Sequence, residues 1–251
     1  MMHEETIRII PNADTAVLLI HGICGSPNHF RQVLPIEHQI PAHWSVHNMV
    51  LDGHCKTVKD FGHSSMKKWW QQAETAFCKL AESHRRVIVV GHSMGTLFAM
   101  ELAKCYPGKI PFLFLLASPV RVSVKPRAVK YLLQIAFDHK DDSDPILVSM
   151  RNACGIRQTR LLWQYVPWAP RMVELLQRCS QTSKMVGNIA VPCIALQSDH
   201  DEMVSHHADK LLEESGRVEV IHLRNSTHFY YAPEDAQIIL DRFQKACEQY
   251  L

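Results

Sequence analysis

The sequence predicts an α/β fold in which helices flank a mostly parallel central sheet and a helical cap is inserted between late strands. Two observations lead to this prediction. Short apolar runs alternate with longer segments of helical periodicity, which is typical of parallel βαβ units. A long segment between residues 117 and 191 interrupts this alternation, and we interpret it as an insertion. A chain of 251 residues is long enough for one large domain with such a cap.

The first part of the chain contains two predicted strands and one long predicted helix. Residues 16–20 form an apolar run that ends at a His-Gly pair, and residues 46–51 form a second strand. Over residues 66–80 apolar side chains recur at helical spacing, and Ser64 or Ser65 is available as the N-cap. We therefore expect an amphipathic helix that packs on the sheet.

The centre of the chain contains the strongest strand signal. Residues 87–90 are a run of Val and Ile that ends at a glycine, as expected for a central parallel strand covered on both faces. Residues 96–106 indicate a helix that stops at a Pro-Gly pair, and residues 112–116 indicate the next strand. The last part repeats the pattern, with strands at 191–196 and 218–223 and a final helix that opens with a proline and two acids.

The segment 120–186 is predicted to be a mainly helical cap. Two groups of apolar residues in it share helical faces, and a polar stretch at 141–145 separates them. The predicted organisation is therefore a core made of residues 1–119 and 187–251, with the cap between these two parts.

Composition limits the classes of partner. The 27 basic and 25 acidic residues give a net charge of +2 without a dense Lys/Arg stripe, so nucleic acid is not an expected partner.

Every apolar stretch falls short of the roughly 18 residues that a membrane-spanning helix needs. The N-terminus lacks the features of a secretory signal, so we expect a cytoplasmic protein whose eight scattered cysteines are free thiols.

Ser93 is the predicted nucleophile. A serine hydroxyl is a poor nucleophile unless an enzyme exposes it, supplies a base and stabilises the oxyanion. Ser93 lies in a Gly-x-Ser-x-Gly pattern where a β-branched strand meets a helix, and the glycines permit a sharp turn that projects the side chain above the sheet edge. The alternatives are Cys24 as the nucleophile and a glycine-rich turn with a capping serine.

Several motifs together resemble the α/β-hydrolase family. A His-Gly pair after the first strong strand, the Gly-x-Ser-x-Gly run, an acid after a late strand and a late histidine follow one another in the family's order. The similarity covers nearly the whole chain and is strongest to small carboxylesterases and monoacylglycerol lipases, through residues 18–27 and 91–95. It implies an α/β-hydrolase fold with a Ser-His-Asp triad. The cap matches no subfamily.

The resemblance also implies roles for particular residues. His228 follows the last predicted strand and would be the general base, and the backbone N–H groups of Ile23 and Met94 would form the oxyanion hole. Two aspartates, Asp199 and Asp201, compete for the acid.

The family's Gly-x-x-Asp-x-x-Val pattern, aligned on Val204, favours Asp201, although Ser198 stands where glycine is usual. Three histidines at 200, 206 and 207 lie near Asp199 but lack a recognised zinc spacing. We therefore expect neither a metal nor a cofactor.

The predicted function is hydrolysis of a small-molecule carboxylic ester with an apolar acyl or alcohol part, through an acyl-enzyme. Thioester hydrolysis, carbon–carbon bond hydrolysis, lyase activity and acyl transfer on the same triad are alternatives, as is a non-catalytic member of the fold that only binds a ligand. Cap residues that could contact the substrate, or could simply form the cap's own core, are Leu132, Leu133, Phe137, Trp163, Tyr165 and Trp168.

Overall fold

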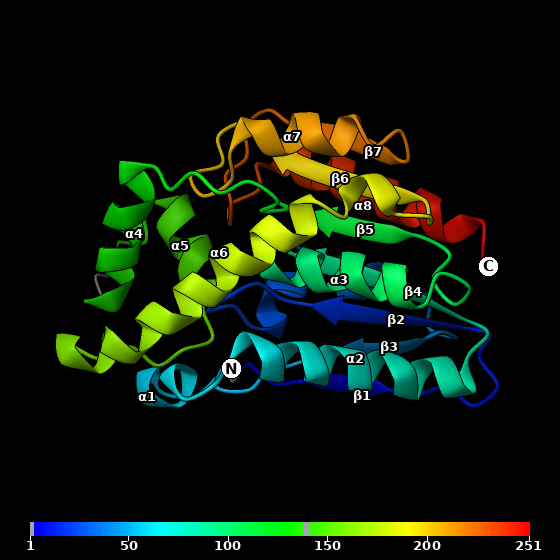
Figure 1. Cartoon of the computed structure of the whole chain (residues 1–251), viewed down its shortest axis with the longest axis horizontal. Helices are drawn as coiled ribbons and strands as arrows, with labels where there is room; N and C mark the ends of the chain where they lie inside the picture. Colours follow the sequence, from blue (N-terminus) through cyan, green and yellow to red (C-terminus); the bar gives the residue numbers. More distant parts are fainter. Residues whose placement is uncertain (1–2, 138–140) are drawn as a thin grey trace.

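The computed structural model describes residues 3–137 and 141–251. The strands within these residues form one sheet of seven strands (Figure 1). The strand order is β1-β3-β2-β4-β5-β6-β7; β1 is antiparallel to β3, and the other neighbouring strands are parallel. The predicted α/β fold with a mostly parallel sheet is thus confirmed. The strands are β1 (Thr6–Arg8), β2 (Thr15–Ile20), β3 (Ser45–Asn48), β4 (Arg86–His92), β5 (Leu113–Leu116), β6 (Cys193–Ser198) and β7 (Val218–Leu223).

Helices cover both faces of the sheet because its central strands are apolar on both. In β2, Leu18 and Ile20 pack with the helices of one face, whereas Val17 and Leu19 pack against the other layer. The first face carries α2 (Met66–Ser83), α3 (Met94–Cys105) and α7 (His206–Glu213), and the second carries η1 (Pro27–Phe30), η2 (Ile36–Gln39) and α8 (Pro233–Glu248). Ser65, one of the two predicted candidates, caps α2 by accepting a hydrogen bond from the backbone of Lys68.

Some element boundaries differ from the predicted ones. Strand β3 is earlier and shorter than the predicted 46–51, and β6 begins two residues after the predicted 191. Pro192 explains the second difference, because it has no N–H to donate to a neighbouring strand. Helix α3 begins two residues before the predicted 96, directly after Ser93. Strand β1 was not predicted, since three residues at the sheet edge produce no periodic signal.

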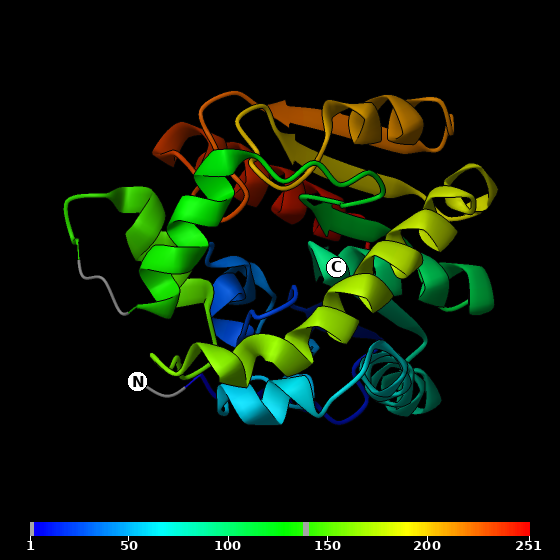
Figure 2. The same ribbon diagram turned by 60° about the vertical axis from the view of Figure 1, so that its left-hand side comes forward.

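The segment 120–186 contains α4 (Pro126–Ala136), α5 (Pro145–Ala153), η3 (Leu162–Trp168) and α6 (Ala169–Ser183). Helices α4 and α5 lie beyond the arrowheads that mark the carboxyl ends of the strands (Figure 1). Figure 2 turns this side forward and shows α6 crossing diagonally in front of the sheet, where it packs on α3. The predicted polar stretch at 141–145 leads into α5. Its residue Asp144 is the N-cap of this helix, because its side chain accepts hydrogen bonds from the backbone N–H groups of Ile146 and Leu147.

Candidate active site

The turn between β4 and α3 holds Ser93 in a backbone conformation that few residues adopt. Its φ is 50° and its ψ is −122°, a sparsely populated region that persists only where the surroundings impose it. Gly91 and Gly95 make the turn feasible: a Cβ at Gly91 would lie 2.7 Å from the backbone of Gly95, and a Cβ at Gly95 would overlap the carbonyl of Ile20. The strand, the turn and the helix therefore place Ser93 at the carboxyl edge of the sheet.

His228 lies between Ser93 and Asp201, within hydrogen-bond distance of both. Its Nε2 is 2.9 Å from Oγ of Ser93, and its Nδ1 is 2.7 Å from Oδ2 of Asp201. A carboxylate only accepts, so Nδ1–H donates to Asp201 and Nε2 is left to accept the serine O–H. All three residues are buried, with at most 7% of their surface exposed. The geometry is that of a nucleophile, a base and an acid that orients the base.

The two candidate acids have different surroundings. Oδ1 of Asp201 accepts backbone hydrogen bonds from Met203 at 2.7 Å and from Val204 at 2.8 Å, which leaves Oδ2 for His228. Asp199 instead lies at the surface, with its Oδ1 3.2 Å from Nδ1 of His222. The structure thus brings Asp201, and not Asp199, to His228.

The electrostatics around His228 favour its protonated form. Burial by itself lowers the pKa of an imidazole, because the charged form loses hydration. Here the charge and the hydrogen bond of Asp201, with a smaller contribution from Glu202, outweigh burial, so the pKa of His228 lies above its ordinary value. An imidazolium that forms at this position is therefore stabilised.

The loop after β2 contacts the turn that carries Ser93. A Cβ at Gly22 would lie 2.9 Å from Cβ of Ser93. The N–H of Cys24 donates to Nε2 of buried His54 at 3.2 Å, and Cys24 has a positive φ of 57°. The predicted oxyanion donors are the N–H groups of Ile23, which lies between Gly22 and Cys24, and of Met94. Met94 lies at the N-terminus of α3, where the first N–H groups lack intrahelical acceptors. The role of both groups remains a prediction.

A histidine pair behind the site was not predicted from the sequence. The rings of His29 and His92 stack with centroids 3.6 Å apart, and Nε2 of His92 lies 3.0 Å from the carbonyl of His228. Burial, together with the nearby His228 and His21, lowers the pKa of His29 to about 3. Burial also holds the pKa of His92 well below its ordinary value, so both rings are neutral near pH 7. His92 contacts the backbone of His228. No motif marks His29, which lies in a short 3₁₀ turn.

The six predicted cap contacts fall into two groups. Leu132, Leu133, Phe137 and Trp163 are exposed. Tyr165 and Trp168 are partly buried and fasten η3 to the rest of the chain, through hydrogen bonds from Tyr165 to Gln158 and from Trp168 to the carbonyl of Val58. Contact of any of these residues with a substrate remains a prediction.

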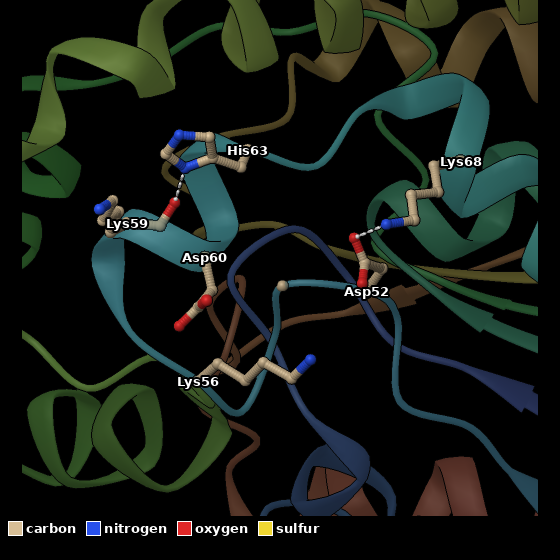
Figure 3. A pocket seen from close by; sticks show the side chains of 7 residues that line it. Asp52, Lys56, Lys59, Asp60, His63 and Lys68 are labelled. Atoms are coloured by element: carbon tan, nitrogen blue, oxygen red, sulfur yellow. Dashed lines mark hydrogen bonds and ion pairs between the residues drawn. The ribbon is translucent and has the colours of Figure 1, made fainter.

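Two hollows elsewhere have charged linings. One of about 410 Å³ beside α1 (Val58–Gly62) contains the ion pair between Lys68 and Asp52, with a distance of 2.7 Å (Figure 3). One of about 520 Å³ lies at the ends of α4 and α5 and is lined in part by three arginines. Ser93, Asp201 and His228 line neither hollow. Over residues 3–137 and 141–251, no three His, Cys, Asp or Glu side chains gather in a way that could hold a metal ion.

Within the same residues, none of the helices has the length and apolar character needed to cross a bilayer.

Most of the chain is similar to known proteins. A family model described as "Serine aminopeptidase, S33" (Hydrolase_4) matches residues 11–230. The thermostable monoacylglycerol lipase of Bacillus sp. (strain H-257) is 24% identical over 234 residues, which are 92% of this chain and 89% of the lipase.

Solved structures share the fold at low sequence identity. A structure described for LipS and LipT, two metagenome-derived lipolytic enzymes, has a TM-score of 0.74 at 19% identity and covers 99% of this chain and 98% of that one. A soluble variant of monoglyceride lipase from Saccharomyces cerevisiae has a TM-score of 0.68 at 14% identity, with 98% and 91% coverage. Monoacylglycerol lipase from Paleococcus ferrophilus has a TM-score of 0.65 at 16% identity, with 97% and 98% coverage.

Proposed function

The chain belongs to the α/β-hydrolase family described as serine aminopeptidase, S33, and on that premise we propose that it hydrolyses carboxylic esters with Ser93 as nucleophile, His228 as base and Asp201 as acid. The observation that carries the proposal is the buried chain of two hydrogen bonds, 2.9 Å and 2.7 Å long, that joins these three side chains. It supports nucleophilic catalysis because it combines an activated hydroxyl with an oriented base.

The proposed reaction has two steps. Nε2 of His228 takes the proton of Ser93 as Oγ attacks the ester carbonyl, and the N–H groups of Ile23 and Met94 stabilise the oxyanion. The tetrahedral intermediate collapses, the alcohol leaves with the proton from His228, and the acyl group stays on Ser93. Water then attacks the acyl-enzyme with the same base, which releases the acid and restores the serine. Asp201 holds the imidazole tautomer and stabilises its charged form without taking the proton.

The proposed substrate is a small ester with an apolar acyl or alcohol part. Segment 120–186, which we propose as the cap, carries exposed apolar side chains on α4 and η3 near the carboxyl ends of the strands. Apolar surface of this kind suits an aliphatic or aromatic group. The similarity to a protein named as a monoacylglycerol lipase points the same way.

A panel of esters tests the proposal. The wild type is assayed on p-nitrophenyl esters of graded acyl length, a monoacylglycerol, an acyl thioester and an aminoacyl p-nitroanilide, and it is labelled with a fluorophosphonate probe. We expect hydrolysis of esters and labelling of Ser93, and loss of both in Ser93→Ala. Ser118→Ala is the matched control, because Ser118, like Ser93, is a buried serine just after a central strand.

The outcomes separate the candidate functions. Ester hydrolysis that survives Ser93→Ala would show that the nucleophile is wrong. Preference for the thioester or the anilide would keep the triad and change the substrate class. A wild type that neither hydrolyses any substrate nor reacts with the probe would favour a ligand-binding member of the fold.

A further inference from the structure

The residue after Asp201 is a second carboxylate, which the reaction proposed above does not use. Glu202 is completely buried. Its Oε2 accepts a hydrogen bond from the backbone N–H of His228 at 3.3 Å, whereas its Oε1 has no partner among the described residues. Burial of an incompletely paired carboxylate is costly. Such a group beside an active site is therefore a candidate for a functional role.

Among the described residues, one cation pairs with Glu202, and it comes from the proposed cap. Nη2 of Arg127, in the first turn of α4, lies 3.8 Å from Oε2 of Glu202 and donates to the carbonyl of His200 at 3.1 Å. The side chain of Arg127 is 46% exposed, so water screens part of its attraction. Much of the negative charge of Glu202 thus remains to act on its other neighbours.

The main chain around Glu202 is fastened to the start of α4. The N–H of Lys125 donates to the carbonyl of Glu202 at 2.8 Å, and its Nζ donates to the carbonyl of Asp201 at 2.5 Å. The N–H of Ser123 donates to the carbonyl of Met203 at 3.0 Å. The loop that carries both carboxylates is consequently held between the core and α4.

We propose that Glu202 is a positioning residue for the hydrolysis: its carboxylate holds the backbone of His228 while Asp201 holds the imidazole ring, and its ion pair with Arg127 joins this arrangement to α4. The inference rests on the proposed function, since it gives His228 the role of base. Two adjacent carboxylates then act on one histidine at two different groups. The orientation of the ring depends on both, because the ring turns about bonds that the backbone positions.

The charge of Glu202 also acts on the imidazole. Burial lowers the pKa of His228, and Asp201 followed by Glu202 raises it to a net value above the ordinary one. Both carboxylates therefore stabilise the imidazolium that forms when His228 takes the serine proton. Among the described residues, other titratable or charged groups also face His228 or the two acids. They come from η1, β4, α4 with its N-cap, and the loop after His228, and they are His29, His92, Lys125, Arg127, Tyr131 and Tyr231.

The test is Glu202→Gln, which keeps the size and an acceptor but removes the charge. We expect the acid limb of the kcat/KM profile of a p-nitrophenyl ester to move about half a unit to lower pH, because the imidazolium loses one stabilising charge. We expect kcat to fall about threefold, the same change expressed as a rate, with KM unchanged. Asp199→Asn is the matched control: it removes a charge from the same loop, but its carboxylate faces His222, so the limb stays in place.

Arg127→Gln gives an independent test at a partly exposed position. Without this cation the charge of Glu202 is less compensated, so the acid limb moves to higher pH. In the double variant with Glu202→Gln, Arg127→Gln causes no further shift, because the charge through which it acts is gone.

The possible results distinguish the inference from the function on which it rests. If hydrolysis depends on Ser93 but Glu202→Gln and Asp199→Asn have the same acid limb, the positioning role is overturned and the proposed function stands. A fall in kcat without a shift of the limb also overturns it, since a general loss of packing would do the same. If Glu202→Gln does not fold, an unmoved limb in Arg127→Gln overturns it. Absence of Ser93-dependent hydrolysis in the wild type refutes the proposed function itself.

Discussion

The loops at the carboxyl edge of the sheet and the segment 120–186 differ in which kinds of side chain they bury and which they expose. At the edge, the polar groups of the candidate site are buried, and each is held by hydrogen bonds from neighbouring loops. In segment 120–186, large apolar side chains are exposed, including Leu133 at 51% and Trp163 at 68%. The edge therefore has the fixed geometry that chemistry needs. In segment 120–186 apolar surface stays exposed, as the proposed contact with an apolar substrate requires.

The largest expected effect comes from replacing the two candidate acids, Asp201 and Asp199, one at a time. Asp201→Asn leaves the shape of the site but removes the acceptor that fixes the His228 tautomer, so kcat should fall about 10⁴-fold. Asp199→Asn should change kcat by less than about twofold, because Asp199 is partly exposed and lies against His222. Ester hydrolysis by the two purified variants measures both values. Equal losses in the two variants would show that the fixed geometry of the edge does not depend on Asp201.

The second prediction compares two leucines of the segment 120–186. Leu147 is fully buried in a cluster with Tyr131 and Met150, so Leu147→Ala should lower the free energy of unfolding by about 2–5 kcal/mol. Leu133→Ala, at a position that is 51% exposed, should change it by less than about 0.5 kcal/mol. Denaturant unfolding measures the difference. A large loss in Leu133→Ala would mean that this surface is covered when the chain is folded.

The sequence predicted well the features that depend on local residue type. Residues 87–90 and the Gly-x-Ser-x-Gly pattern predicted β4 and the turn of Ser93, because a buried parallel strand and a forced turn both depend on local residue type. His228 was predicted because it follows the last predicted strand and because the order of the α/β-hydrolase motifs puts the histidine last.

Other features depend on contacts between distant segments, so the sequence could not predict them. The family pattern aligned on Val204 favoured Asp201 over Asp199, but the partners of the two aspartates, His228 and His222, follow from the loop geometry. The stacking of His29 on His92 joins residues 63 positions apart. The sequence predicted helices in segment 120–186, but it could not predict which apolar residues stay exposed, because a helical face looks the same whether it covers a core or faces solvent.

The third prediction concerns pH and the buried histidines behind the edge. Burial lowers the pKa of His29 to about 3 and that of His21 to about 4, against 6.5 in the unfolded chain. Between pH 6.5 and 4 the unfolded state therefore binds protons that the folded state does not. The free energy of unfolding is therefore highest above pH 6.5. As the pH decreases below 6.5, it falls by up to about 1.4 kcal/mol per pH unit for each of these two histidines.

Unfolding by denaturant at a series of pH values measures this slope. His29→Phe keeps an aromatic ring against His92 but cannot titrate, so it should reduce the slope by the contribution of one histidine. His38→Phe is the control, because His38 is exposed. An unchanged slope in His29→Phe would mean that His29 is protonated, or reaches solvent, in the folded protein.

The smallest expected effect concerns Trp163 and tests whether the exposed apolar surface of segment 120–186 contacts the substrate. Trp163→Ser should leave the free energy of unfolding unchanged within about 0.5 kcal/mol, because the side chain is 68% exposed. If Trp163 contacts the acyl group, KM for a long-chain p-nitrophenyl ester should rise about threefold to tenfold, as expected from the loss of 1 kcal/mol or so of apolar contact. KM for the acetyl ester should not change, since an acetyl group offers little apolar surface for Trp163 to contact. Val173→Ser on α6, where the side chain is 53% exposed, provides the comparison. Equal KM changes for short and long esters would show that Trp163 acts through the structure of the segment and not by touching the chain.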